Sequence, residues 1–393
     1  MNLLPGTQGG PAVEAMPMPS APPPGKPTTP RFVLVDALRG VAATWVVLCH
    51  AIIGGHLPDL AARLPRPVVA LMEAGRVPVS IFFVLSGFVI AYSVSRHEVN
   101  ARFVGRFALR RSIRLDPPYW AAIALTLAIG YASQFFVAGK VYPLPEPWSV
   151  AAHLLYLQEI LGAPEINIAF WTLCLEVQFY LVFCLLLALA HRFRRDEADR
   201  RSTLAIFVPV MMVSAAWPLR IAPFASLEPW FLPSWYGFLV GMAACWAMLR
   251  IIPAWLFVAY VLLLCVGVAR YPDINVITCI LTASLLYLAA RLGTLSTWLG
   301  FRWLLFLGSI SYSLYLMHNP ITGAFYRVAY RLTGRGAAAE LAWFAPMIAV
   351  NVAVAYGFWW LFERTSMALC HRVRMARPTR PEPPEIEPPS SRS

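Results

Sequence analysis

The 393-residue chain is poor in charge and has no long polar stretch in which a soluble domain could fold. Only 13% of its residues are charged and 59% are hydrophobic, with a mean hydropathy of +0.62. The longest connection between the apolar runs covers residues 139–167. This composition is typical of a polytopic membrane protein. It excludes an appended soluble catalytic domain within these residues, so any chemistry must take place inside the membrane bundle.

Cysteine pairs are also lacking. The seven cysteines are odd in number, lie mostly in apolar runs, and form no C-x-x-C pair. We therefore expect neither a disulfide framework nor a metal site. The formal net charge of +12 comes from 32 basic residues, most of them in short loops. No nucleic-acid-binding motif is present, so we interpret these residues as topology signals and expect no nucleic-acid partner.

Both ends of the chain are rich in proline. Residues 1–32 hold nine prolines and no apolar run typical of a signal peptide, which predicts a disordered cytoplasmic tail. Residues 366–393 read as a basic juxtamembrane segment followed by a second disordered, proline-rich tail. The membrane domain is therefore expected to cover residues 33–365.

The apolar runs predict an all-α integral membrane fold of about ten transmembrane helices around a central cavity. Each run is long enough for a hydrocarbon core of about 30 Å. The predicted spans are 33–54, 77–94, 117–138, 168–190, 203–222, 233–249, 254–269, 274–292, 303–323 and 341–362. With the N-terminus inside, 22 Lys and Arg residues fall in cytoplasmic segments and 9 on the opposite side. The positive-inside rule thus favours an N-in, C-in topology. We expect the protein to lie in the inner (plasma) membrane.

Two local features refine this prediction. Residues 148–161 (WSVAAHLLYLQEIL) have the pattern of a single interfacial amphipathic helix. In residues 102–120 (RFVGRFALRRSIRLDPPYW), Asp116, Pro117 and Pro118 are expected to end a basic helix and turn the chain into the membrane.

The first span carries ionisable residues where charge is costly. Asp36, Arg39 and His50 lie on one stripe of a helix, because eleven residues rotate by about 1100° and return within ~20° of the same face. Asp36 and Arg39 could form a structural pair near the membrane surface. His50 has no acidic neighbour in sequence, which makes it a candidate functional residue.

Two further spans bring polar side chains to the height of His50, in the outer half of the bundle. Glu176 and Trp171 lie in WTLCLEVQFY, near the start of the span 168–190. His318 and Tyr315 share one face of the span 303–323. Charged and polar groups at this depth indicate a functional site.

The opposite side carries a cluster of arginines, of which Arg110, Arg111 and Arg114 lie within one helical turn. Guanidinium forks suit phosphate, although the cluster could also serve only as a topology signal or bind anionic headgroups. Glu363 could be a surface anchor or a partner for this cluster. Ser86 and Gly87 permit either close helix packing or a small cavity wall, and packing is favoured.

Five of these stretches, in this order, resemble the membrane acyltransferase family 3, whose members O-acylate sugars, polysaccharides and antibiotics with acyl-CoA. The resemblance covers about residues 31–365. It is carried by the following stretches: VDALRGVAATWVVLCH (35–50), FFVLSGFVI (82–90), Arg111-x2-Arg114 with Pro117 and Tyr119, WTLCLEVQFY (171–180), and LGSISYSLYLMHNP (307–320). The resemblance implies that His50 is the catalytic residue and that Arg39, Arg111 and Arg114 serve activity or donor binding.

These observations predict an O-acyltransferase that moves an acyl group, expected to be acetyl, from cytoplasmic acyl-CoA to a hydroxyl of a carbohydrate or glycoconjugate. The predicted catalytic residues are His50, Glu176 and Arg39, and the predicted donor-binding residues are Arg110, Arg111 and Arg114. Trp171, Ser86, Tyr315 and His318 are expected to bind the acceptor. His50 could act as a general base or form an acyl-histidine. A glycan transporter without acyl chemistry and a scaffolding membrane protein are the alternatives.

Overall fold

The computed structural model describes residues 32–95, 97, 100–136, 141–193, 201–221, 230–373 and 375. Residues 1–31 of the predicted N-terminal tail and most of the predicted C-terminal tail lie outside these residues. The described residues form helices and no β-strand. The helices are α1 (Val33–Ile53), α2 (Pro58–Ala61), α3 (Arg66–Glu73), α4 (Arg76–Val94), α5 (Ala101–Phe136), α6 (Pro147–Leu154), α7 (Gln158–Leu161), α8 (Trp171–Arg192), α9 (Arg201–Ser214), η2 (Leu232–Ser234), α10 (Trp235–Met248), α11 (Ala254–Arg270), α12 (Ile274–Arg291), α13 (Arg302–Ser309), α14 (Ser311–Thr333), α15 (Ala337–Phe358), η3 (Trp359–Glu363) and α16 (Arg364–Cys370).

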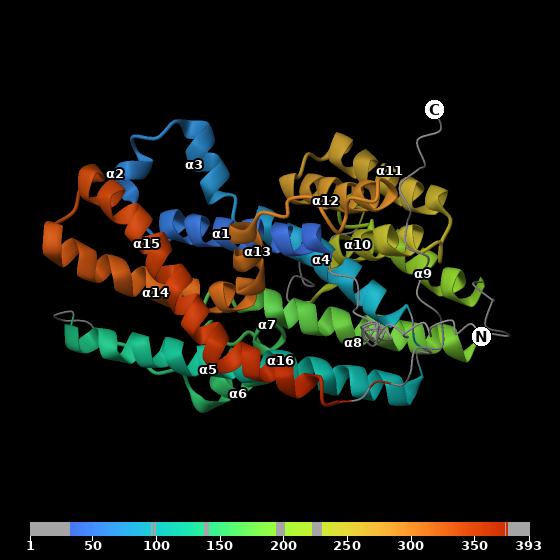
Figure 1. Ribbon diagram of the computed structural model, residues 1–393, viewed down its shortest axis with the longest axis horizontal. Helices are drawn as coiled ribbons and strands as arrows, with labels where there is room; N and C mark the ends of the chain where they lie inside the picture. The colour runs from blue at the N-terminus through green and yellow to red at the C-terminus, as the bar shows by residue number, and fades with distance from the viewer. Residues whose placement is uncertain are drawn as a thin grey trace, which may run out of the picture. The chain divides into compact units, whose positions relative to one another are not determined.

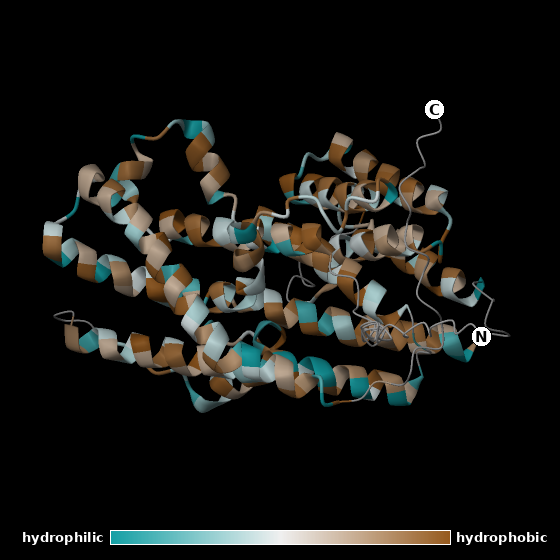
Figure 2. Ribbon diagram, in the orientation of Figure 1, coloured by the Kyte–Doolittle hydropathy of each residue, from teal (hydrophilic) through white to brown (hydrophobic). Residues whose placement is uncertain are grey.

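The all-helical character predicted from the sequence is confirmed for the described residues, and the apolar helices are consistent with a membrane protein. In the described part of the chain, six helices are long and apolar enough to cross a membrane: α1, α4, α5, α8, α12 and the continuous helix Ala337–Cys370. Brown, hydrophobic residues dominate the helices, whereas teal, hydrophilic residues gather on the first half of α5 and beside α16 (Figure 2). The predicted number of ten spans and the N-in, C-in topology stay predictions.

The core of the bundle is the packing of α4 against α10. These two helices make the most extensive contact between elements, and α12 packs against both. α10 is buried along almost its whole length. On the other side, α1 packs against α13 and α14, and α14 pairs with α15. In Figure 1, α1, α8 and α5 run in nearly the same direction, and α15 crosses them obliquely.

Two glycines allow α4 and α10 to touch through their main chains. A Cβ atom at Gly87 would overlap the carbonyl group of Phe238, and a Cβ atom at Gly241 would overlap that of Val84. Small residues let helix backbones approach closely in membrane proteins. The predicted packing role of Gly87 is therefore confirmed, whereas its neighbour Ser86 faces a cavity.

The structure corrects three local predictions. The first concerns Pro117 and Pro118, which do not end the basic helix: α5 runs without interruption through both prolines. The φ angle of proline suits a helix, but each proline removes one N–H bond to the preceding turn and its ring crowds the carbonyl group four residues back. The carboxylate of Asp116 accepts hydrogen bonds from Ser112 and from the Tyr156 hydroxyl, so this part of the helix is held from both sides.

The second correction concerns residues 148–161, which form two short helices, α6 and α7, instead of one. The chain breaks at Tyr156, whose φ of 57° lies in the left-handed region. The Tyr156 hydroxyl bonds to Asp116, and its ring stacks on Tyr119 with 4.6 Å between centroids. Tertiary contacts to α5 therefore overrule the amphipathic pattern.

The third correction concerns the predicted span 303–323, which is divided at Ile310 into α13 and α14. α13 packs tightly on α1, because a Cβ at Gly308 would overlap the main chain of Asp36 and one at Gly40 would lie 2.6 Å from the Leu304 carbonyl oxygen. α14 then leaves in another direction and carries the chain on to Thr333.

We expect Gly87→Ala and Gly241→Ala each to lower the stability of the protein by about 1–3 kcal/mol, because the added methyl group forces α4 and α10 apart. The matched control is Gly105→Ala on α5, where a Cβ atom meets nothing within 4 Å. Thermal unfolding of the purified proteins in detergent measures the difference. Equal midpoints of thermal unfolding for Gly87→Ala and Gly105→Ala would show that the contact between α4 and α10 tolerates a wider spacing.

Candidate active site

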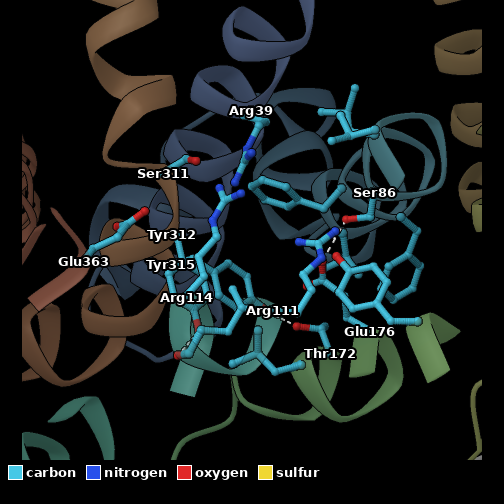
Figure 3. Close-up of a pocket in the computed structure, with 18 residues that line it drawn as sticks. Arg39, Ser86, Arg111, Arg114, Thr172, Glu176, Ser311, Tyr312, Tyr315 and Glu363 are labelled. Carbon is cyan, nitrogen blue, oxygen red and sulfur yellow. Dashed lines mark hydrogen bonds between the residues drawn. The ribbon is translucent and has the colours of Figure 1, made fainter. Parts of the chain in front are cut away.

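A cavity of about 90 Å³ lies between α1, α4, α5, α8, α14 and η3, and we call it the arginine pocket (Figure 3). Its lining residues are Arg39, Val79, Phe82, Phe83, Leu85, Ser86, Val89, Arg111, Arg114, Leu115, Thr172, Leu173, Glu176, Tyr180, Ser311, Tyr312, Tyr315 and Glu363. The α4 residues that line it run from Val79 to Val89, so it extends about 15 Å along that helix. Six residues predicted from the sequence to form the site thus meet in one cavity: Arg39, Arg111, Arg114, Glu176, Ser86 and Tyr315.

Three arginines converge in this pocket from two helices. Arg39 enters from α1, and Arg111 and Arg114 enter from one face of α5, a helical turn apart. The guanidinium groups of Arg39 and Arg114 point toward each other (Figure 3). Like charges this close, in a half-buried site, need an anion or carboxylates to offset them.

Glu176 and Ser86 meet Arg111 on one side of the pocket. The Ser86 hydroxyl donates a 2.9 Å hydrogen bond to Glu176 Oε1. The Arg111 guanidinium lies beside them in Figure 3 and stacks over the Tyr180 ring, 4.0 Å from its centroid. The stacking fixes the plane of the guanidinium while leaving its N–H groups directed into the cavity.

Glu363 occupies the other side, near Arg39 and Arg114 (Figure 3). Its side chain is only 4% exposed, and Ser313 donates a 2.6 Å hydrogen bond to its Oε2. The prediction of a surface anchor is therefore wrong, and the alternative of a partner for the arginines is confirmed. Glu363 ends the π-helical turn η3, and the wider turn rotates the residues after it relative to an α-helix. No sequence pattern predicts that turn.

Thr172 and Tyr315 form the far end of the pocket. The Tyr315 hydroxyl lies 2.8 Å from the Ala169 carbonyl oxygen, which can only accept, so the tyrosine donates its one hydrogen there. The Tyr315 and Thr172 hydroxyl groups also share a 2.6 Å hydrogen bond, and Thr172 lies 3.4 Å from the same Ala169 carbonyl oxygen. The tyrosine is therefore held in one orientation at the end of the cavity.

His50 and His318 lie side by side beyond Tyr315. Their ring centroids are 4.8 Å apart, and the His318 centroid is 5.9 Å from that of Tyr315. The structure thus confirms that α1 and α14 bring the two histidines together. The described residues that line the arginine pocket end at Tyr315 and do not include either histidine.

The main chain sets the tautomer of both rings. His50 Nδ1 lies 3.0 Å from the Val46 carbonyl oxygen, and His318 Nδ1 lies 2.7 Å from that of Tyr315. A carbonyl oxygen can only accept, so each Nδ1 carries hydrogen and each neutral ring presents the lone pair of Nε2. His318 Nε2 is buried and has no hydrogen-bond partner within the described ranges. Each of the two imidazoles can therefore accept a proton or a hydrogen bond at Nε2.

His153 on α6 shows the contrasting, structural arrangement. Its Nδ1 donates to the Ser149 carbonyl oxygen at 2.8 Å, and its Nε2 accepts from the main-chain N–H of Ile166 at 3.3 Å. Burial lowers the pKa of this imidazole, which keeps it neutral and able to accept. Both nitrogens are occupied, so His153 ties α6 to the following loop.

Besides the two histidines, two further predicted site residues lie outside the arginine pocket. Arg110 turns to His371, with 2.9 Å between the guanidinium and Nδ1. Trp171 lies under the Arg76 guanidinium, 5.7 Å from the ring centroid, and lines a separate cavity. Within the described ranges, no cluster of three or more His, Cys, Asp or Glu side chains could hold a metal ion.

We expect Glu363→Gln to lower thermal stability markedly, by roughly 3–5 kcal/mol, because it leaves Arg39 and Arg114 without their carboxylate. Arg114→Gln in the same protein should restore part of the loss by removing one of the repelling charges. A double-mutant cycle on thermal midpoints measures this coupling. Arg302→Gln, at an exposed position on α13, serves as the control. Strictly additive effects of the two pocket substitutions would contradict the assignment of Glu363 as the counter-charge.

A family model described as "Acyltransferase domain" (Acyl_transf_3) matches residues 32–360. Among similar proteins, acyltransferase MdmB of Streptomyces mycarofaciens is 28% identical over 278 residues, which are 67% of this chain and 64% of that protein. A Bacillus subtilis (strain 168) protein named as a putative peptidoglycan O-acetyltransferase, YrhL, is 26% identical over 297 residues, 63% of this chain and 44% of that protein. Nodulation protein 10 of Rhizobium leguminosarum bv. viciae is 28% identical over 222 residues, 53% of this chain and 58% of that protein.

This chain therefore covers less than two thirds of the length of each of these relatives. No solved structure matches it. The family model extends over every residue of the arginine pocket except Glu363, and over both histidines of the pair. This match confirms the resemblance seen in the motifs, and the chain belongs to the acyltransferase family 3 of membrane proteins.

Proposed function

We propose that the protein is an O-acyltransferase of the inner (plasma) membrane that uses acyl-CoA, expected to be acetyl-CoA, to acylate a hydroxyl group of a carbohydrate or glycoconjugate. One observation carries this proposal: three guanidinium groups converge at one end of a narrow cavity whose other end adjoins two imidazoles with open lone pairs. The names of the similar proteins, acyltransferase MdmB and putative peptidoglycan O-acetyltransferase YrhL, support the same reaction class.

The arginine pocket suits the phosphate groups and the arm of the donor. Three arginines face two carboxylates, Glu176 and Glu363, so the pocket retains a positive charge for an anion. A cavity of about 90 Å³ holds only part of acyl-CoA. In this proposal the nucleotide lies outside it, against the basic first half of α5, where Arg102 and Arg106 are exposed and Arg110 is half-buried. The thioester would reach the Tyr315 end of the pocket.

His50 acts as the general base in this proposal. Its Nε2 accepts the proton of the acceptor hydroxyl while the hydroxyl oxygen attacks the thioester carbonyl carbon. A new C–O bond forms, the C–S bond breaks, and the proton on His50 passes to the departing sulfur. Val46 holds the ring through Nδ1, so Nε2 faces the reaction. His318, beside it, can accept a hydrogen bond from the acceptor and orient it.

The carboxylates around the arginines offset their charge. Glu176, held by Ser86, offsets the charge of Arg111, and Glu363, held by Ser313, offsets the charges of Arg39 and Arg114. These carboxylates offset enough charge for the pocket to remain folded before the donor binds. They leave the donor phosphates as the remaining counter-charge.

We expect His50→Gln to lower the turnover number by roughly 10²–10⁴-fold, because glutamine keeps a polar side chain but cannot take a proton. Acceptor-dependent release of free thiol from acetyl-CoA in membranes measures this. His153→Gln is the matched control, since His153 makes the same Nδ1 bond but already uses Nε2. Unchanged turnover in His50→Gln would rule out the assignment, and acceptor movement without thiol release would favour a transporter.

Replacing Arg111 and Arg114 together by glutamine should raise the KM for acyl-CoA by roughly 10–100-fold, because charge-assisted hydrogen bonds to phosphate are lost. The KM for the acceptor should change little. Arg291→Gln, at the exposed end of α12, is the control. Steady-state kinetics with each substrate varied in turn separate the two effects. A rise confined to the acceptor KM would place the donor elsewhere.

A further inference from the structure

A second cavity, of about 410 Å³, lies beside the arginine pocket at the start of α4, and we call it the α12 cavity. It is lined by Arg76, Val79, Ser80, Phe83, Trp171, Leu175, Trp217, Pro218, Arg220, Pro233, Ser234, Tyr236, Asp273, Asn275, Val276 and Cys279. Its volume lies within the roughly 300–1,000 Å³ typical of small-molecule sites. The donor proposed above needs none of its polar residues.

The α12 cavity lies at the histidine end of the bundle. α4 begins beside the end of α1, because a Cβ at Gly75 would overlap the sulfur of Cys49, the residue before His50. Arg76 follows directly and lines the cavity. Val79 and Phe83 line both cavities, so only one layer of side chains separates them.

Asn275 presents an acceptor that nothing in the described structure satisfies. Asp273 caps α12, and its Oδ1 accepts from the Asn275 main-chain N–H at 2.8 Å and from the Asn275 side-chain amide at 3.0 Å. These two bonds fix the orientation of the amide. Asn275 Oδ1 is then buried and without a hydrogen-bond donor within the described ranges. An unsatisfied buried acceptor of this kind calls for a ligand that donates.

Two arginines and an indole complete the site. Arg76 lies over the Trp171 ring at 5.7 Å, and Arg220 lies over the Tyr271 ring at 4.9 Å. Stacking keeps these guanidinium groups in defined planes, with N–H groups left for an acceptor. The cavity therefore offers both donors and acceptors, next to the flat apolar surface of Trp171.

A ligand for this cavity must donate to Asn275 and accept from the arginines at once. A carboxylate or a sulfate satisfies the arginines but has no hydrogen to give to Asn275. Neighbouring hydroxyl groups of a sugar ring do both, and the apolar face of the ring can pack on Trp171. We propose that the α12 cavity binds a sugar residue through neighbouring hydroxyl groups, and that it is the acceptor-recognition site. Its role as acceptor site rests on the proposed function, whereas sugar binding itself does not.

Binding of sugars to the purified protein, without acyl-CoA, tests this inference. The protein is placed in lipid nanodiscs, because detergents with maltoside headgroups would compete. Saturation-transfer NMR titrations use chitobiose, cellobiose and maltose as probes, and sodium sulfate as the competing anion. We expect signals from the ring protons of at least one disaccharide, and no displacement by sulfate.

Asn275→Leu should weaken sugar binding about ten-fold, because a ligand hydroxyl loses its acceptor. The fold should persist, since Asp273 still caps α12 through the main-chain N–H of residue 275. Arg291→Gln at the exposed end of the same helix is the control. The Arg111→Gln, Arg114→Gln protein should keep its sugar binding, which separates this site from the donor site.

Binding that is lost in Asn275→Leu and kept in Arg291→Gln supports the inference, even if acyl transfer fails for other reasons. Three results overturn it: no signal from any of the three disaccharides, binding that Asn275→Leu leaves unchanged, or displacement by sulfate, which would identify an anion site.

Discussion

The main physical constraint on this structure is the free-energy cost of burying three guanidinium groups inside an apolar helix bundle. Arg39, Arg111 and Arg114 lie close enough to repel one another, and burial removes the water that would screen them. Glu176 and Glu363 offset this repulsion only in part. Each carboxylate is held by a serine, so the counter-charges are in place before a donor binds. In the proposed function, an anionic donor completes the balance of charge.

Helix packing makes this arrangement possible. The contact of α4 with α10 through Gly87 and Gly241 places the adjacent residue, Ser86, on the pocket side of α4. The contact of α1 with α13 through Gly40 and Gly308 places Arg39 inward and starts α14 at the level of the pocket. The close helix contacts that hold the bundle together therefore also turn the polar side chains of the arginine pocket toward one another.

The two ends of the site rely on different physics. At the arginine end, three guanidinium groups offer a concentration of positive charge. At the histidine end, carbonyl oxygens of Val46 and Tyr315 set the tautomers and leave each Nε2 as a directional hydrogen-bond acceptor. The α12 cavity, at this second end, adds donors and acceptors of fixed orientation. A charged donor and a polyhydroxylated acceptor would thus be recognised by separate means and meet near His50.

Composition and periodicity are enough to predict the class of the fold and most of the pocket. Low charge and long apolar runs predict membrane helices, and ionisable residues within such runs must gather in a shared interior because lipid cannot solvate them. For this reason the amino-acid sequence singles out Arg39, Arg111, Arg114, Glu176 and Tyr315 as candidate functional residues. It predicts Arg111 and Arg114 at the opposite side of the bundle from Glu176 and Tyr315, and the tertiary structure brings them into one pocket.

The tertiary structure decides where the helices are interrupted and which side chains near the interruptions turn inward. Tyr156 and Ile310 interrupt predicted helices, Pro117 does not, and the π-turn brings Glu363 inward. Such choices depend on contacts between distant segments, which local periodicity does not record.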